Sequence, residues 1–317
     1  MSAHYRFSHY RVVLMFFAAL LGNLLVVLPG QAESLLKPYI LASQTTGTDV
    51  TASVADVRKK LADAGFELVG EYSPYPNANI TIITNDELKQ NAAATEYGGF
   101  GASLRVTVTQ KDAEVQVAYT NPVYMANAYR MKSDLTSVAA ALKTALGDKG
   151  EYGPEKGLSA EDLREYHYKW LMPYFTDRIE LVKYKDYDAA IAAVTKSLSS
   201  GNRGGVKQVY RIDIPGKQQS VIGVSMAGPD NVECSGDKYI MDRIDFKPLR
   251  STGHLPYEML VSGNAVYTLP AEFRIAISFP DLSMVGSNSF ASIMCAPTAI
   301  SKALNFGAGG KGEEDSM

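Results

Sequence analysis

Two cysteines carry much of the chemistry that this sequence could perform. Cys234 and Cys295 are its only cysteines, and they allow either a disulfide closing about 60 residues or two separate thiols. A bridge of that length is worth about 4 kcal/mol in the chain-entropy model. Neither cysteine lies in a spacing that demands a partner, so both states remain open.

Cys295 directly precedes Ala296 and Pro297, a pair that is typical of a helix start. Backbone N–H groups at such a start stabilise a thiolate, and His254 would then be the base of a nucleophilic pair. No glycine-rich elbow and no third orienting group accompany them, and a cysteine among apolar neighbours is usually a packing residue. A thiol-dependent enzyme is therefore our third hypothesis.

Copper or haem would need soft ligands, and residues of suitable types are present: His167, His254, Cys234, Cys295, Met284 and Met294. Their spacing gives no support, because the sequence contains no CxxCH, HxxxH or CxxC motif. A haem- or metal-binding accessory protein is the second hypothesis. The leading expectation is a protein without a cofactor.

The segment 254–258 (HLPYE) places a histidine, a tyrosine and an acid where a strand begins. It is either a strand-entry turn with Tyr257 at the sheet rim, or one wall of a pocket that also includes Arg274. Arg274 lies in the apolar run FRIAISF, which we predict to be a strand with Arg274 on a solvated face, since an unpaired buried charge is costly. The candidate ligand-binding residues are His254, Tyr257, Arg274 and Met284.

Residues 1–32 have the composition of an export signal. Arg6 and Arg11 precede the apolar stretch 12–28, and residues 30–32 (GQA) form a small-x-small triplet. We predict cleavage after Ala32, which makes the mature protein periplasmic or secreted. The alternative is an uncleaved anchor, because the apolar run reaches the short end of a membrane span, and only then do we expect the membrane as a partner.

The composition narrows the range of partners. Removal of the signal leaves 29 basic and 34 acidic side chains, a formal charge of −5. No basic stripe interleaved with aromatic residues is present, so nucleic acid is not an expected partner. We expect a non-enzymatic protein that binds a small molecule or a periplasmic protein through its sheet faces or an interdomain cleft, with homo-oligomerisation left open.

Two stretches, 104–146 and 259–304, look like copies of one unit. Each holds two strand-like runs about a turn, a proline, a methionine and an Ala-rich helix, and 24 residues separate both Pro122 from Leu146 and Pro280 from Leu304. A helix pattern and alternating strand patterns precede each unit. The sequence therefore predicts an α+β protein with two similar domains, each an antiparallel sheet with helices packed on one face.

Three features of the first copy recur in one bacterial protein family. They are a helix that closes in Gly65-Phe66, a central hairpin over 104–118, and a strand that ends with Tyr119 three residues before Pro122. In these features the chain resembles the DUF302 family, over about residues 48–146. The resemblance implies a TBP-like β-α-β4-α fold, with 180–305 as a diverged second copy. The family offers no catalytic motif to transfer, and a fold does not define a function.

These patterns divide the chain into five parts. They are a signal peptide (1–32), a first DUF302-like domain (33–147), a linker with an aromatic helix (148–178), a second DUF302-like domain (179–306) with an insertion at 228–256, and a flexible acidic tail (307–317). The aromatic helix, capped by Ser159, would pack against the domains with Leu163, Tyr166, His167, Trp170, Leu171 and Tyr174. The insertion distinguishes the two copies, so we expect function there.

Overall fold

Short strands and capped helices alternate along the first half of the chain. The computed structural model describes residues 34–47 and 49–311, so the predicted signal peptide and the end of the acidic tail lie outside the described residues. The first-half elements are β1 (Tyr39–Thr46), α2 (Val50–Asp63), β2 (Glu67–Tyr72), β3 (Ala78–Thr84), α3 (Asp86–Ala94), η1 (Gly98–Gly101), β4 (Leu104–Lys111), β5 (Glu114–Thr120), α4 (Pro122–Ala128), α5 (Thr136–Leu146), β6 (Glu151–Tyr152) and α6 (Ala160–Arg164). Asp49 and Asn85 cap α2 and α3 with side-chain hydrogen bonds.

The second half repeats this alternation and adds short helices. Its elements are β7 (Ile179–Lys183), α7 (Tyr187–Ser200), β8 (Val206–Asp213), β9 (Gln219–Met226), η2 (Asp230–Ser235), α8 (Asp237–Ile244), η3 (Thr252–His254), β10 (Tyr257–Ser262), β11 (Ala265–Thr268), α9 (Ala271–Ser278), η4 (Phe290–Ile293) and α10 (Ala296–Gly307). Asp186 caps α7, because its side chain accepts a hydrogen bond from the backbone N–H of Ala189. The predicted α+β class is confirmed.

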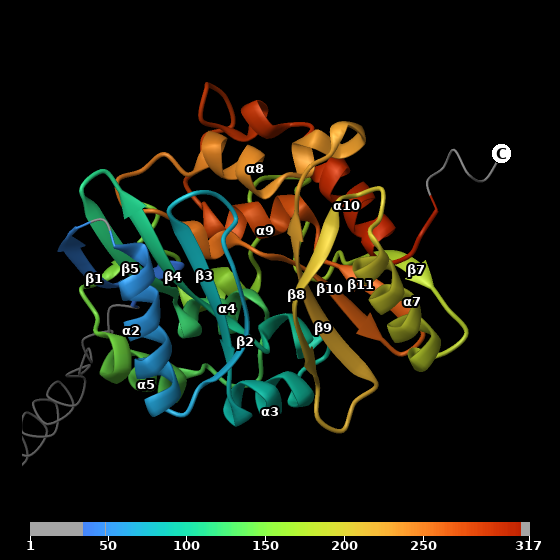
Figure 1. Ribbon diagram of the computed structural model, residues 1–317, viewed down its shortest axis with the longest axis horizontal. Helices are drawn as coiled ribbons and strands as arrows, with labels where there is room; N and C mark the ends of the chain where they lie inside the picture. The colour runs from blue at the N-terminus through green and yellow to red at the C-terminus, as the bar shows by residue number, and fades with distance from the viewer. Residues whose placement is uncertain (1–33, 48, 312–317) are drawn as a thin grey trace, which may run out of the picture. The chain divides into compact units, whose positions relative to one another are not determined.

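The strands form two antiparallel sheets, of six and five strands (Figure 1). The first sheet has the order β2-β3-β4-β5-β1-β6, and the second has the order β8-β9-β10-β11-β7. Pairing the strands by their place in each half matches β2 with β8, β3 with β9, β4 with β10, β5 with β11 and β1 with β7. The two orders are then the same, apart from the additional β6.

Helices cover one face of each sheet in the same way. In the first half α2 packs on β2, β3, β4 and β5, with α5 beside it, and in the second half α7 and α10 pack on β7, β8, β10 and β11. The apolar stripe of α2 is Val54, Val57 and Leu61, at the spacing of three and four that a helix requires. This arrangement leaves the opposite faces of the sheets available to contact other parts of the chain.

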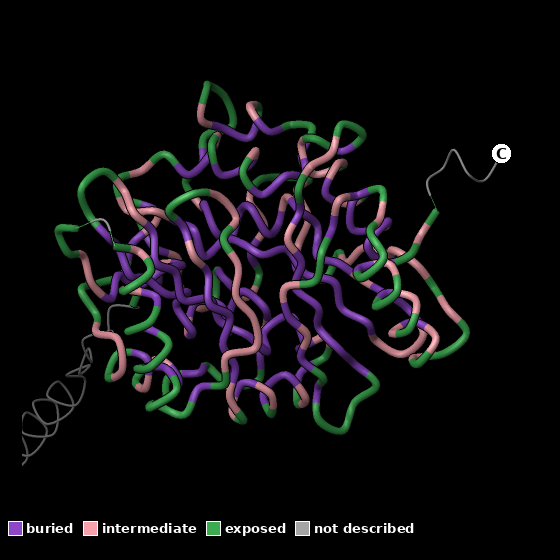
Figure 2. Tube along the Cα trace, viewed as in Figure 1, coloured by how far each residue is buried: buried purple, intermediate pink, exposed green. Residues whose placement is uncertain are grey.

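The two halves share one core. Most buried apolar side chains of both sheets form one large cluster, beside a small one of Tyr39, Leu41, Ala118 and Tyr152, and the chain from Leu35 onward is one compact unit (Figure 2). The edge strands β2 and β8 lie against each other. Their approach requires a glycine at position 70, because a Cβ there would lie 2.6 Å from the carbonyl oxygen of Val209. The fold thus brings equivalent edges of the two sheets together.

The predicted aromatic helix is wrong beyond its first turn. Ser159 caps α6 as expected, but the helix ends at Arg164. Leu171 has a φ of +68°, a left-handed conformation that a right-handed helix cannot contain. Trp170 and Leu171 are 84% and 81% exposed, so they do not pack against either half.

The predicted strand FRIAISF is also wrong, because these residues form α9. Alternation was misleading here: all residues of α9 except Glu272 are buried, and a helix buried on every side has no polar stripe to reveal its period. Pro122 and Pro270 stand directly at the starts of α4 and α9, after equivalent hairpins. Pro270, and not Pro280, therefore has the place after its hairpin that Pro122 has after the first one, and Pro280 lies beyond the end of α9.

Candidate functional site

The insertion covers the polar face of the first sheet. Thr252 bonds with the hydroxyls of Thr109 on β4 and Tyr75, each at 2.9 Å. Gln116 on β5 donates to the carbonyl of Pro248 at 2.9 Å and accepts from the N–H of Arg250 at 3.0 Å. The face of the first sheet opposite α2 is thus occupied by the chain's own residues.

The structure brings three of the four predicted ligand-binding residues together. The Nε2 of His254 lies 2.9 Å from the hydroxyl of Tyr257, and the carbonyl of His254 accepts a hydrogen bond of 2.8 Å from Arg274. All three are buried. Burial, with the charges of Arg274 and Arg105, holds the pKa of His254 well below its usual value. This histidine is a neutral core residue with little access to a ligand.

The prediction that Arg274 lies on a solvated face is wrong. Its guanidinium lies inside the protein and donates to the hydroxyl of Tyr129 at 2.5 Å and to the carbonyl of Pro256 at 3.4 Å. Tyr129 follows α4 of the first half, whereas Arg274 belongs to α9 of the second. The arginine therefore joins the two halves, and its charge is balanced by carbonyl and hydroxyl oxygens.

Sequence patterns did not reveal a second buried link between the halves. Arg105 on β4 and Glu258 on β10 form an ion pair of 2.6 Å with both side chains 1% exposed. Burial works to lower the pKa of Arg105, but the charge of Glu258 and the hydroxyls of Tyr210 and Tyr129 together outweigh it and raise that pKa. Tyr210 donates to Glu258, and Ser103 lies 2.9 Å from the same tyrosine hydroxyl. An arginine within the β-branched run LRVTVT was the only signal in the sequence.

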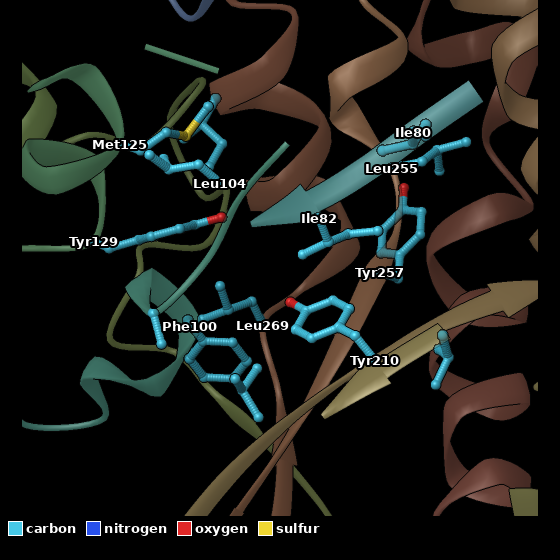
Figure 3. Close-up of a cluster of buried hydrophobic side chains, with 14 of the residues drawn as sticks. Ile80, Ile82, Phe100, Leu104, Met125, Tyr129, Tyr210, Leu255, Tyr257 and Leu269 are labelled. Atoms are coloured by element: carbon cyan, nitrogen blue, oxygen red, sulfur yellow. The ribbon is translucent and has the colours of Figure 1, made fainter. Parts of the chain in front are cut away.

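Apolar side chains surround these polar links. Figure 3 shows Ile80 and Ile82 of β3 in one cluster with Leu255 and Tyr257 of the second half, and with Tyr210. We call the cluster formed by Arg105, Glu258, Tyr210, Tyr129, Arg274, His254 and Tyr257 the buried polar seam. Its members bond mainly with one another and with the backbone, as a structural network does.

Two buried acids flank α8 within the insertion. Burial raises the pKa of Asp237 to about 7, although Asp237 accepts a 3.2 Å hydrogen bond from the N–H of Met226. Burial likewise raises the pKa of Asp245 to about 6, while Arg250 and the N–H of Ser251 oppose this shift. Burial therefore disfavours the charged form of both carboxyl groups, whose hydrogen bonds with the N–H groups of Met226 and Ser251 lie within the second half.

A small recess lies between the insertion and the end of α9. Asp245, Ser251 and Ser278 line it, and its volume of about 20 Å³ holds about one water molecule. Lys247 and Asp281 form an ion pair of 2.6 Å at the same recess. Neither His254, Tyr257 nor Arg274 lines it. The recess is too small to receive a substrate or an extended ligand.

Cys234 and Cys295 form a disulfide with an S–S distance of 2.10 Å. The bridge ties the insertion to the start of α10, where Ala296 and Pro297 begin the helix as predicted. Both cysteines lie in the described part of the chain, so no free thiol remains there. The nucleophilic pair of Cys295 and His254 has no thiol in this state.

Apolar side chains project from two neighbouring loops. We define the apolar loop surface by its exposed members Trp170, Leu171, Met284, Val285 and Met294. Tyr168 joins the loops, because its ring lies 4.8 Å from that of Phe290 and its hydroxyl donates to the carbonyl of Leu282. Met284, the fourth predicted ligand residue, is 43% exposed here and does not lie in the buried polar seam.

Comparison with known proteins gives no relative: no protein-family model, no curated protein and no solved structure matches the chain. Across residues 34–47 and 49–311, no group of three or more His, Cys, Asp or Glu side chains is placed to hold a metal ion. None of the helices in these ranges has both the length and the apolar character needed to cross a membrane.

Proposed function

We propose that this chain is an exported, non-enzymatic binding protein that contacts its partner through the apolar loop surface. The observation that carries the proposal is the exposure of Trp170, Leu171, Val285 and Met294, each more than 70% exposed. Isolated exposed apolar residues are common, but a group of large ones on adjoining loops marks an interaction site. Tryptophan and methionine are also enriched in interface cores.

The covered sheet favours this surface over a cleft. The insertion fills the polar face of the first sheet, and the nearby recess has room for about one water molecule. A small-ligand site normally needs a cavity of several hundred cubic ångströms. We therefore move the expected binding function from the sheet faces and the interdomain cleft to the loops.

We further propose that the two halves are tandem copies of a TBP-like unit of the DUF302 type. The shared strand order of the two sheets and the equivalent positions of Pro122 and Pro270 support this origin. In this view the second copy acquired the insertion, which closed the open face of the first. The disulfide is in keeping with an oxidising compartment such as the periplasm.

Site-specific photo-crosslinking in the native host tests the binding surface without assuming the partner's class. A photoreactive residue replaces Leu171 or Val285, and the control replaces Lys60 in the shallow groove of about 570 Å³ between α2 and α5. We expect adducts from the two loop positions and none from the groove. Adducts from Lys60 alone, or equal yields at all three positions, contradict the proposal.

A further inference from the structure

We propose that the apolar loop surface docks on a phospholipid bilayer. This inference rests on the proposed function, because it names the partner of the same surface. Three observations support it. They are two loops held by internal hydrogen bonds, a stretch of chain without charged residues, and the short separation in sequence between the predicted apolar segment and Leu35.

The first loop is a turn that displays Trp170 and Leu171 at its tip. The N–H of Met172 donates to the carbonyl of Lys169 at 2.9 Å, and the Nδ1 of His167 lies 2.9 Å from the same oxygen. These contacts hold two of the largest apolar side chains outward. Tryptophan and tyrosine are the residues that gather at membrane–water interfaces, and the flanking Lys169 can reach a lipid phosphate.

The second loop presents apolar groups without any charge. The N–H of Phe290 donates to the carbonyl of Ser283 at 2.9 Å, and that of Ala291 donates to the carbonyl of Met284 at 3.2 Å, which closes the loop and exposes Val285. The twenty residues 282–301 contain no Asp, Glu, Lys, Arg or His, although a chain with 21% charged residues would place about four there. A charge-free exposed loop can enter an acyl layer, where each charge would be costly.

The predicted apolar segment near the N-terminus also favours a bilayer as the partner. Only six residues separate the predicted apolar segment 12–28 from Leu35, which is itself 45% exposed. Six residues span about 20 Å at most. Whenever that segment lies in a membrane, during export or as an anchor, Leu35 is held close to the bilayer surface.

Tryptophan emission reports on this surface alone, because Trp170 is the only tryptophan in the sequence. The exported protein is mixed with vesicles of phosphatidylethanolamine and phosphatidylglycerol, with and without brominated acyl chains. We expect a blue shift of the Trp170 emission and quenching by the brominated lipid. Leu171→Ser and Val285→Ser should each weaken vesicle binding about tenfold, the loss expected for one buried aliphatic side chain. Phe246→Ser is the matched control, since Phe246 is 51% exposed and apolar but outside the surface.

Vesicle binding without a Trp170 shift would assign the contact to another segment and overturn the proposal. A shift that depends on protein concentration without vesicles would indicate a second copy of the chain as the partner, and it would also overturn it. If photo-crosslinking at Leu171 captures protein while vesicles leave the emission unchanged, the bilayer is excluded and the binding surface stands. If neither experiment responds, both proposals fall.

Discussion

The buried polar seam and the apolar loop surface reverse the usual distribution of side chains. In the seam, Arg105, Glu258 and Arg274 place charges inside the protein, and each has partners there. On the loops, Trp170 and Val285 expose large apolar groups to solvent. Buried charges that are paired within the chain contribute to a unique structure, whereas exposed apolar groups gain free energy only from a partner. The two regions should therefore respond to mutation in opposite ways.

Removing one partner of the buried ion pair should have the largest effect on stability. Arg105→Met leaves Glu258 charged in the interior, and we expect the free energy of unfolding in urea to fall by about 3–5 kcal/mol. The double variant Arg105→Met/Glu258→Leu should recover most of this loss. Lys59→Ala, in the exposed pair with Asp63, is the control and should leave the free energy of unfolding nearly unchanged. Equal costs for Arg105→Met and Lys59→Ala would contradict the structural role of the seam.

Loss of the disulfide should have the next largest effect. The bond joins residues 61 apart, so Cys234→Ser/Cys295→Ser should lower the free energy of unfolding by at most about 4 kcal/mol. The bridge ties the insertion, which contributes His254 to the buried polar seam, to α10. The melting temperature with and without reductant measures the effect. An unchanged melting temperature on reduction, with both thiols shown to be free, would contradict it.

The buried acids predict a dependence of stability on pH. The folded pKa of Asp237, about 7, lies above that of the unfolded chain, so the folded state holds the proton more tightly and stability falls as the pH rises from about 4 to about 7. Asp237→Asn stays neutral, and we expect it to be more stable than the wild type by about 4 kcal/mol at pH 8, with no gain at pH 4. His254 is present in both proteins and cancels from the difference. A constant difference between pH 4 and pH 8 would contradict this account.

Changes on the loop surface should have the smallest effect on stability. Trp170→Ser removes a side chain that is 84% exposed, so the free energy of unfolding should change by less than about 0.5 kcal/mol. Urea titration followed by circular dichroism measures this without the tryptophan signal. A loss of more than about 2 kcal/mol would mean that Trp170 packs in the core, and the contrast with the seam would disappear.

The sequence predicted the elements whose signal is local. The sequences of β4 and β5 alternate with a period of two, and α2 and α7 carry a cap and an apolar stripe, so their positions could be read directly. The helix start at Ala296 and the cap at Ser159 also follow from neighbouring residues. These predictions needed no knowledge of the tertiary structure.

Long-range contacts account for what the sequence did not predict. Arg274 was assigned to a solvated strand because its partners, Tyr129 and the carbonyl of His254, are distant in sequence. The pair of Arg105 and Glu258 is separated by 153 residues and has no local signature. Tryptophan usually packs in a core, so the sequence predicted that Trp170 would be buried. The structure shows instead that it faces solvent beside the left-handed turn at Leu171.

Hydrogen–deuterium exchange with and without vesicles compares the two regions in one measurement. We expect vesicles to slow deuterium uptake in residues 165–175 and 283–294, which include the apolar loop surface. Uptake in β4 and β10, which carry the buried polar seam, should stay slow and unchanged. Protection that appears only in the insertion, or no change in either loop segment, would contradict the claim that this protein binds through its exposed apolar loops.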